Sequence, residues 1–551
     1  MRGGNAVKNK KENKGTIWQK IDMHILIPGA LCLLLIVVLG AVIPREFDAA
    51  LLNVLDWIMS HFKWVYVLCV LMVTALCLFV VFSKWGNIRF GGKDARPSLK
   101  TSTWFTLSLT GTIAVGICFY GVSGPVNLFM NPPEFLGVEG GTAEAVIPTL
   151  EYCFLHYGIP PFFLICCVAL MIALVYYNGR QSLKASSTLS PLLGDKCHGI
   201  IGTLINILVI ICMIDCGTNM GLAVIQLDAG IGTVSGMSET PSFEPYIVIV
   251  YTVLAIVFAC SGVHKLMGKL SNFNAICYFV IMIFVLLFGP VGGNRLLTLG
   301  FEAVGQYITD FLSMISFGDS VAQTGWQNNN TMFYYSWNLV PGLLQALFYV
   351  SIAYGRNLRQ FILVNCVMPA AVTGLWYVIF GGTAMLQILD GSNLYDLMLQ
   401  YGDGIATFAF LDTLPGGAFL KWFFIVLAMI TFITFADSIA YSIPMLFMKK
   451  TELDPSLTKV PKSFNATVGL FMGFLTFVLL YVGGYDALNS AIVVCGFPAA
   501  IVTIFVVIAA VKFLSNRKKY DYTYREELGI PDDVPGEDPG DPVPEVLEII
   551  E

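Results

Sequence analysis

Twelve apolar stretches that could cross a lipid bilayer alternate with polar loops along the chain. A transmembrane helix needs about 20 predominantly apolar residues, because the hydrocarbon core of a bilayer is about 30 Å thick. The stretches lie at residues 25–43, 64–82, 104–120, 152–177, 199–225, 246–263, 275–291, 333–354, 361–380, 422–448, 468–482 and 491–511. The pattern predicts an all-α polytopic membrane protein with 12 transmembrane helices.

The composition favours a membrane protein over a soluble one. Of the 551 residues, 56% are hydrophobic and 12% are charged, whereas soluble domains have about 25% charged residues. The mean hydropathy is +0.74. The net charge of -6 lies largely in the C-terminal tail, and no basic patch with interleaved aromatic residues predicts a nucleic-acid partner. The 14 cysteines have neither metal-ligand nor disulfide spacing, so we interpret them as small residues of the lipid phase or the core.

Basic residues are distributed unequally between the two sets of loops. The set that includes both termini carries 27 of the 31 lysine and arginine residues. The opposite set carries Arg45, Lys63, Arg295 and Lys421. Because cytoplasmic loops have an excess of Lys and Arg, this distribution predicts a multi-pass protein of the cytoplasmic (inner or plasma) membrane with both termini in the cytoplasm. Residues 1–21 precede an apolar span without a small-residue cleavage site, which predicts an uncleaved first helix.

Two segments outside the apolar stretches have patterns of their own. In residues 296–317, apolar residues recur at near-helical spacing with Glu302, Gln306 and Asp310 between them. This pattern predicts a helix that lies in the membrane interface. Residues 514–551 are acidic and contain five prolines from Pro531 onward, which predicts a disordered cytoplasmic tail. Residues 22–513 then form the membrane domain.

Polar residues interrupt several of the apolar stretches. An unpaired polar group in hydrocarbon costs several kcal/mol, so it usually faces protein or a water-filled cavity. The third stretch continues through Gly124, Pro125 and Asn127, and it is predicted to line a site. The same prediction holds for the tenth stretch, which contains Thr431, Thr434, Asp437 and Ser438. Other polar positions are interpreted as interhelical hydrogen-bonding groups, with site lining as the alternative: Asn206, Asp215, Asn219, Asn272 and Asn274.

The eighth stretch has the richest set of aromatic and polar side chains. One helical face carries Phe333, Trp337, Pro341, Gln345 and Phe348, and Asn338 lies at its border. Pro341 and Gly342 should kink this helix. A kinked helix that presents a Trp, an amide and a Phe could hold a cation against an aromatic ring. Ordinary helix packing is the alternative interpretation of the same stripe.

Four segments carry a resemblance to a known family. They are SSTLSPLLGDK at 186–196, GTNMGLAVIQL at 217–227, TMFYYSW at 331–337 and TFADS at 434–438. Together with Gly355, Arg356 and Arg359, they resemble motifs of the betaine/choline/carnitine transporters. The resemblance extends from the first apolar stretch to the twelfth.

The resemblance implies a fold and a mode of action. It implies a LeuT-like core of two inverted five-helix repeats, at about 104–291 and 332–511, preceded by two extra helices. It also implies a homotrimer that the interfacial helix at about 296–317 helps to pack among membrane lipids. The activity implied is secondary transport of a small quaternary or methylated amine, such as a betaine or a carnitine-like compound, by alternating access.

The resemblance also implies which residues bind the substrate. In this family a box of aromatic side chains from the fourth and eighth helices holds a quaternary ammonium. Here the box is incomplete, because Asn338 and Pro341 occupy aromatic positions and Ile165 replaces a Tyr. We expect Tyr157, Trp337 and Phe348 to cage the ammonium, and Asn338 and Gln345 to hydrogen-bond a carboxylate or hydroxyl. The candidate substrate-binding residues are Trp337, Tyr157, Asn338, Gln345, Phe348 and Phe333.

The resemblance leaves the coupling ion open. Thr434 matches a sodium-site hydroxyl, but Phe435 replaces the Ser beside it, and the third helix has fewer glycines than the sodium-coupled pattern. The candidate ion-coupling residues are Thr434, Thr431, Asp437 and Asn274. A sodium ion is therefore one candidate cofactor, and exchange, sodium symport and proton symport all remain alternatives.

Several other classes of protein are alternatives to a betaine transporter. No paired carboxylates, metal-ligand cluster or phosphate-binding glycine loop predicts an enzyme or an ATP-driven pump. A LeuT-like transporter of an amino acid or another non-quaternary substrate is the alternative function. A receptor or channel is a weaker alternative, since the sequence predicts no soluble signalling domain.

Overall fold

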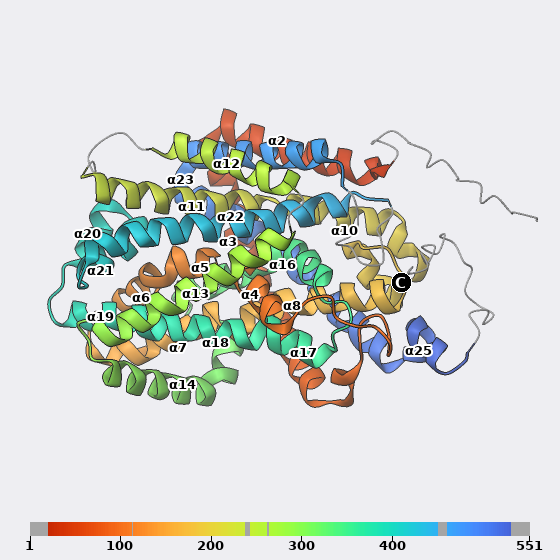
Figure 1. Ribbon diagram of the computed structural model, residues 1–551, viewed down its shortest axis with the longest axis horizontal. Coiled ribbons are helices and arrows are strands. Elements are labelled where there is room, and N and C mark those ends of the chain that lie inside the picture. The colour runs from red at the N-terminus through yellow and green to blue at the C-terminus, as the bar shows by residue number, and fades with distance from the viewer. Residues whose placement is uncertain (1–19, 113, 237–242, 262–263, 450–459, 531–551) are drawn as a thin grey trace, which may run out of the picture.

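The protein is an assembly of helices in the computed structural model, which describes residues 20–112, 114–236, 243–261, 264–449 and 460–530 (Figure 1). In the first half the helices are α2 (Met23–Val42), α3 (Pro44–Phe82), α4 (Thr101–Thr112), α5 (Ala114–Cys118), α6 (Tyr120–Met130), α7 (Val146–Tyr157), α8 (Ile159–Ala173), α9 (Ser190–Leu193), α10 (Ile200–Ile211), α11 (Ile214–Ser235), α12 (Glu244–Ser261) and α13 (His264–Phe288). In the second half they are α14 (Gly293–Ser316), α15 (Trp326–Asn329), α16 (Thr331–Ser351), α17 (Leu358–Ile362), α18 (Met368–Trp376), α19 (Gly382–Leu389), α20 (Leu394–Tyr401), α21 (Ala406–Asp412), α22 (Gly417–Leu446), α23 (Lys462–Ser515), α24 (Arg517–Tyr520) and α25 (Tyr522–Glu527). In the described residues, β-pairing is limited to two isolated bridges, Ile21 with Met448 and Arg89 with Asn357.

Eight helical segments of the described chain are long and apolar enough to cross a membrane: Arg45–Phe82, Ala143–Asn178, Ile200–Ser235, Gly268–Phe288, Leu358–Leu389, Gly417–Ala436, Lys462–Tyr481 and Ile492–Ser515. Two shorter apolar helices, Met23–Leu39 and Glu244–Val257, match the first and sixth predicted spans. The third and eighth predicted spans correspond to α4–α6 and to α16, which carry backbone breaks or polar side chains. The chain is thus an all-helical, multi-pass membrane protein, and the count of twelve spans stays a prediction.

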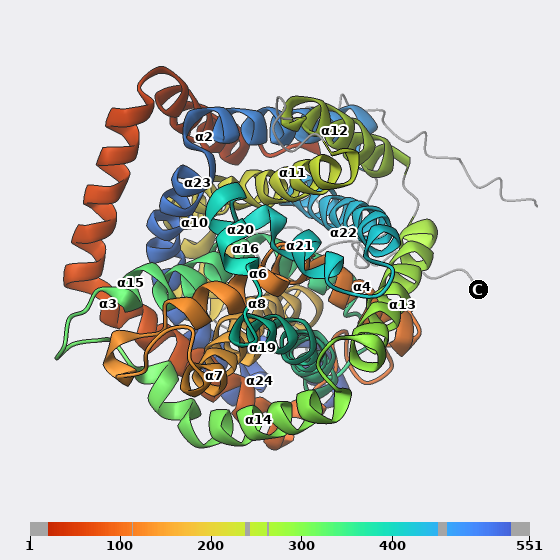
Figure 2. The ribbon, with the colours of Figure 1, turned by 90° about the vertical axis from the view of Figure 1, so that its left-hand side faces the viewer.

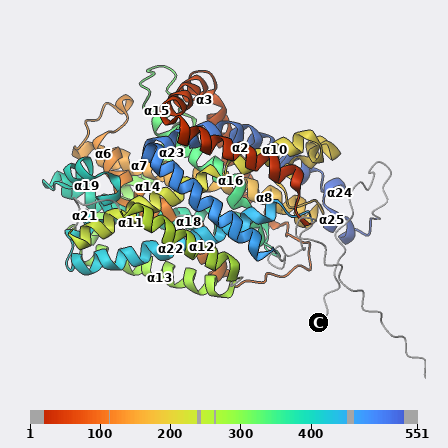
Figure 3. The same cartoon turned by 90° about the horizontal axis from the view of Figure 1, so that it is seen from above.

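The two predicted sides of the membrane correspond to opposite ends of the molecule. Helices α19, α20 and α21, whose connections are poor in basic residues, lie at one end (Figures 1 and 3). Helices α24 and α25 lie at the other end, where the basic segment 84–100 meets them through the amide of Lys93, which donates to Glu527 Oε1 at 3.1 Å. The helices between the two ends surround α8 and α16, which pack against each other near the centre (Figure 2). The basic loops and the loops poor in basic residues therefore lie at opposite ends of the long axis. The assignment of one end to the cytoplasm stays a prediction.

The eleventh and twelfth predicted spans form one helical element. The sequence predicts two helices at 468–482 and 491–511, whereas α23 runs from Lys462 to Ser515 over 54 residues. Its first part packs on α12, where Gly473 lies against Thr252. Its second part packs on α3 and α16, where Gly496 lies against Ser336. A straight helix of this length would be about 80 Å long, far more than the hydrocarbon core. Two stretches within it, Lys462–Tyr481 and Ile492–Ser515, are each long and apolar enough to cross a membrane. The eleventh and twelfth predicted spans are thus both found as candidate spans.

Helix α14 has the amphipathic pattern expected of it and runs along the outside of the helices (Figure 2). One face is buried, with Leu296, Ala303 and Tyr307 against the rest of the molecule. Phe301 and Ile308 on the other face are 78% and 71% exposed. The predicted helix at 296–317 therefore exists with an apolar outer face, and its place in the membrane interface stays a prediction.

The first part of the predicted disordered tail is helical. Asp521, which lies between α24 and α25, is fully buried, and its Oδ1 accepts from Asn178 Nδ2 at 3.3 Å. The carboxylate also pairs with Arg517 at 2.7 Å. Composition cannot predict this docking, because it does not show that Asn178 and Arg517 lie where they can bind the Asp521 carboxylate. The prediction of disorder is wrong for residues 517–527, and residues 531–551 lie outside the described chain.

Candidate functional site

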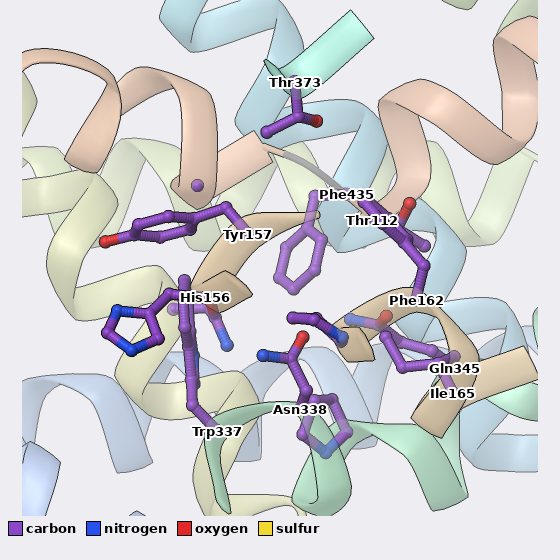
Figure 4. A pocket seen from close by; sticks show the side chains of 14 residues that line it. Thr112, His156, Tyr157, Phe162, Ile165, Trp337, Asn338, Gln345, Thr373 and Phe435 are labelled. Carbon is purple, nitrogen blue, oxygen red and sulfur yellow. The ribbon is translucent and has the colours of Figure 1, made fainter. Parts of the chain in front are cut away.

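A small cavity lies where the broken helices meet the centre of α16 (Figure 4). It measures about 50 Å³, which is room for a few water molecules. Eight helices contribute to its wall, since its lining residues are Thr112, Gly116, His156, Tyr157, Pro161, Phe162, Ile165, Asn219, Trp337, Asn338, Pro341, Gln345, Thr373 and Phe435. A larger molecule would require these side chains to move apart.

Helix α16 contributes the largest share of the lining. Trp337, Pro341 and Gln345 follow one another at four-residue intervals and therefore share a face. Pro341 has no N–H, so the carbonyl one turn earlier loses its usual helical donor. The Oε1 atom of Gln345 is buried and has no hydrogen-bond partner in the described residues. This part of the helix thus presents an indole ring and an amide to the cavity.

The candidate substrate residues divide into two groups. Four of them, Tyr157, Trp337, Asn338 and Gln345, line the cavity, whereas Phe333 and Phe348 do not. The Phe333 ring stacks on Trp337 with centroids 6.2 Å apart and an interplanar angle of 11°. Phe348 is buried beside Tyr349, at 6.4 Å between centroids. The two phenylalanines share the periodic face of α16, but they lie beyond the ends of the short cavity.

Further aromatic side chains support Tyr157 and Trp337. The Tyr120 ring meets Trp337 edge to face at 5.4 Å and lies 5.9 Å from the Tyr157 ring. The Tyr157 hydroxyl donates to that of Tyr334 at 2.6 Å. Tyr377 lies 4.8 Å from Tyr157 between centroids, and its hydroxyl donates to the Gly116 carbonyl at 2.6 Å. Tyr120 and Tyr377 are not among the candidate residues, because contacts between separate helices leave no signal in the local sequence pattern.

The backbone turns sharply next to Tyr157. Gly158 separates α7 from α8 with φ of −104° and ψ of −133°. Pro160 and Pro161 follow in the first turn of α8, where a missing N–H costs least. Gly124 of α6 faces the Tyr157 hydroxyl, and a Cβ atom there would lie 2.9 Å from it. The break and the small residue together allow the phenol to reach into the centre of the molecule.

The third and tenth stretches both contribute to the cavity wall, but through other residues than the ones from which a site-lining role is predicted, so that role stays a prediction. Thr112 and Gly116 line the cavity from α4 and α5, and Phe435 lines it from α22. Figure 4 shows the Phe435 ring pointing into the space between Tyr157 and Asn338. The sequence missed Phe435 as a lining residue because an apolar ring among aliphatic residues carries no polar signal.

The polar residues interpreted as hydrogen-bonding groups differ in role. Asn206 Nδ2 donates to Ser186 Oγ at 3.0 Å, and Asn272 accepts from Thr106 of α4, so both join separate segments as expected. Asn219 does not join separate segments, because its Nδ2 donates at 2.9 Å to the carbonyl of Asp215 in its own helix. The interpretation is wrong for Asn219, which lines the cavity instead.

The candidate ion-coupling residues form a second polar cluster. Asn274 Nδ2 donates to Thr431 Oγ1 at 3.0 Å, and the Tyr278 hydroxyl lies 2.7 Å from the same oxygen. Thr434 Oγ1 donates to the Thr431 carbonyl at 2.8 Å. None of these four residues lines the cavity, and the side chain of Asp437 lies outside the described part of the chain. Tyr278 was not among the candidates, since a tyrosine in an apolar helix also fits simple packing.

A hydrogen bond links the end of α6 that is remote from α25 to the segment 390–416. Asn127 Nδ2 donates to Asp403 Oδ2 at 2.9 Å. Burial raises the pKa of Asp403 above its ordinary value, while the hydrogen bond from Asn127 acts in the opposite direction. Asn131 of the adjoining loop donates to the Tyr395 hydroxyl at 3.3 Å. The segment 390–416 is thereby tied to α6, the helix that carries Tyr120.

Fold and site together define a multi-pass helical membrane protein with a small cavity, lined by aromatic rings and amides, at its centre. The chain belongs to the betaine/carnitine/choline transporter family, because the BCCT family model matches residues 24–519. This result confirms the family resemblance of the sequence motifs.

Relatives of known name align along most of the chain. The glycine betaine transporter OpuD of Bacillus subtilis is 29% identical over 487 residues, which cover 87% of this chain and 92% of that protein. The ectoine/hydroxyectoine transporter of Virgibacillus pantothenticus is 25% identical, with coverage of 89% and 96%. The osmo-dependent choline transporter BetT2 of Acinetobacter baylyi is 27% identical, with coverage of 88% and 70%. Transport, and not an enzymatic reaction, is what these relatives have in common.

Proposed function

We propose that this protein is a secondary active transporter of a small quaternary or methylated-amine zwitterion, betaine-like or carnitine-like, across the cytoplasmic membrane. The observation that carries the proposal is that Trp337 and Tyr157 line the same small cavity as the amides of Asn338 and Gln345. Family membership supports it, since relatives are named as transporters of glycine betaine and choline.

The chemistry of the lining suits such a substrate. A quaternary ammonium has no N–H to donate, so it is recognised by its charge against the faces of aromatic rings. Attraction of this kind contributes about 2 kcal/mol when the cation is desolvated. The N–H groups of Asn338 and Gln345 can donate to a carboxylate or hydroxyl at the other end of the molecule. The buried, unpaired Oε1 of Gln345 adds an acceptor for a substrate hydroxyl.

Alternating access accounts for the small size of the cavity. A space of about 50 Å³ is smaller than a betaine needs, so binding requires Phe435 and the aromatic rings to separate. In the proposed mechanism, two inverted five-helix repeats rock around the midplane site and expose it to one side at a time. The proposed assembly is a homotrimer in which the exposed apolar face of α14 contributes to packing, with both termini in the cytoplasm.

The coupling ion is proposed separately from the substrate. The oxygens of Thr431, Thr434 and Asn274, with Asp437 nearby in sequence, are the candidate sodium ligands, because hard cations prefer oxygen ligands. Sodium-independent exchange is the competing mode, and it is supported by the hydrogen bonds that Thr431 already makes to Asn274 and Tyr278.

Counterflow in proteoliposomes tests the proposed function. Vesicles are preloaded with one betaine and offered labelled glycine betaine, carnitine or proline betaine, with and without sodium. We expect counterflow of at least one quaternary amine, and we expect Trp337→Ala to abolish it. Trp57→Ala is the matched control, because Trp57 is 53% exposed on α3. If no quaternary amine exchanges under either condition, the proposal is wrong, and uptake of an amino acid becomes the function to test.

A further inference from the structure

A helix break lies inside the fifth apolar span. The sequence predicts one continuous span at 199–225, but α10 ends at Ile211 and α11 begins at Ile214. At the break, the backbone N–H of Met213 donates to the carbonyl of Ile210, and the backbone N–H of Asp215 donates to the carbonyl of Cys212. Both bonds reach three residues back instead of four, which marks a tight turn within an apolar segment. Asp215 lies in the first turn of α11, where the helix dipole favours a negative or polarisable group.

Asp215 is a buried carboxyl group that has no ion-pair partner in the described residues and has the Asn219 amide beside it. It is 0% exposed, and neither of its two side-chain oxygens has a hydrogen bond within the described residues. An isolated carboxylate in a low-dielectric interior is very costly, so the group is either neutral or balanced by a bound cation. The cavity described above does not include it, and the ion-coupling candidates lie on α13 and α22.

The surroundings of Asp215 favour a proton over a metal cation. The titratable side chains near it are the thiols of Cys212 at the break, Cys216 on α11 and Cys495 on α23. Tyr251 of α12 is buried nearby, and its hydroxyl donates to the Phe432 carbonyl. Sodium and other hard cations need several oxygen ligands, whereas thiols suit soft metals. A proton requires only the carboxyl oxygen itself.

Asp215 is connected to the cavity through Asn219. Asn219 follows one helical turn later, lines the cavity and donates its Nδ2 hydrogen to the Asp215 carbonyl. When Asp215 is protonated, its O–H is a donor; when the proton leaves, both oxygens become acceptors, and the Asn219 amide is the adjacent donor that can turn toward them. Loss of the proton therefore changes a hydrogen bond at the wall of the cavity.

We propose that Asp215 is a proton-binding site that couples proton movement to transport. This inference rests on the transport function proposed above. The carboxylate takes up one proton on one side of the membrane and forms a neutral carboxylic acid. It releases the same proton to the other side after the site has changed its access, so charge and atoms balance over the cycle. Asn219 transmits the protonation state to the substrate.

The test separates proton coupling from substrate exchange. Full-length protein in proteoliposomes is given an inward proton gradient and, separately, equal pH on both sides for counterflow of the betaine that exchanges. Wild type should accumulate this substrate when driven by the proton gradient. Asp215→Asn, which mimics the neutral acid, should keep counterflow and lose the gradient-driven accumulation. Asp215→Glu should retain it in part, and Asp412→Asn, at the exposed ion pair with Lys421, should behave like wild type.

Several results would overturn the proposal. Accumulation by Asp215→Asn equal to that of wild type would do so, as would wild-type uptake that ignores the proton gradient. Loss of a sodium-driven component in this variant would assign a metal cation instead. Infrared spectroscopy gives a readout without substrate: purified wild type at neutral pH should show a protonated-carboxyl band that Asp215→Asn lacks. Absence of this band contradicts the proton site even if the betaine function fails, while absence of counterflow alone contradicts only the function.

Discussion

The Tyr157 hydroxyl donates a 2.6 Å hydrogen bond to the hydroxyl of Tyr334, and this bond joins the end of α7 to the first turn of α16. The His156 ring stacks on Tyr334 at 4.4 Å with an interplanar angle of 18°. The phenol that lines the cavity is therefore held by a residue that does not line it. Tyr334 is a positioning residue for the proposed ammonium site.

Tyr334→Phe is expected to weaken substrate binding severalfold and leave the fold intact. The substitution keeps the ring against His156 and removes one hydrogen bond, which costs about 1 kcal/mol. The Tyr157 ring then loses the contact that orients it. Binding of the counterflow substrate to purified protein measures the effect, and Tyr481→Phe, at a ring that is 80% exposed, is the control. Unchanged affinity in Tyr334→Phe would show that this hydrogen bond does not orient the site.

Gln345→Leu is expected to raise thermal stability while it lowers affinity. The buried Oε1 of Gln345 has no partner in the described residues, and an unsatisfied buried polar group costs about 1–3 kcal/mol. Leucine has a similar size and no polar atom. The melting temperature in detergent and substrate binding should therefore change in opposite directions. Gln400→Leu on the exposed surface of α20 is the control. A fall in both quantities would indicate that Gln345 has a structural role only.

Asp403 is expected to make stability depend on pH in the acidic range. Because burial raises the pKa of Asp403, the folded protein holds this proton more tightly than the unfolded chain does. The stabilisation is complete below the ordinary pKa of about 3.9 and is lost as the pH rises through the raised value. The melting temperature of wild type should fall relative to Asp403→Asn over this window. Asp396→Asn, at an exposed position, should follow wild type, and a constant difference between wild type and Asp403→Asn would refute the expectation.

Asp521→Ala is expected to release α25 from the body of the protein. The Asp521 carboxylate accepts from Asn178 Nδ2 and from the amide of Tyr524, and it pairs with Arg517. Breaking a buried ion pair by removing one partner costs about 3–5 kcal/mol. Limited proteolysis should cut the variant within residues 517–530 faster than wild type. Lys518→Ala, at an exposed residue of the same segment, is the control; equal cleavage of Asp521→Ala and wild type would contradict the role of this contact.

Part of the site could be predicted, because helical periodicity is a property of one segment and does not depend on its contacts with other segments. The spacing of Trp337 and Gln345 places them on one face of α16, and the cavity does include both. The same face also includes Phe333 and Phe348, 15 residues or about 22 Å apart. Periodicity shows which side of a helix is shared but not how far along it a cavity extends. The two phenylalanines therefore do not line the cavity, and their part in substrate binding stays a prediction.

The sequence by itself determined the class of protein, the helices and the family. Burial of about 20 apolar residues in lipid is a property of each segment alone, and the family motifs are contiguous. Only the tertiary structure decided that Asn219 of α11 and Phe435 of α22 reach the same cavity as Tyr157 of α7. It also decided that Asp215 is buried without an ion-pair partner in the described residues, whereas Asp521 has several partners. These relationships depend on contacts between residues far apart in the chain, which local pattern does not encode, because a polar atom in an apolar helix has the same sequence signature whether a partner faces it or not.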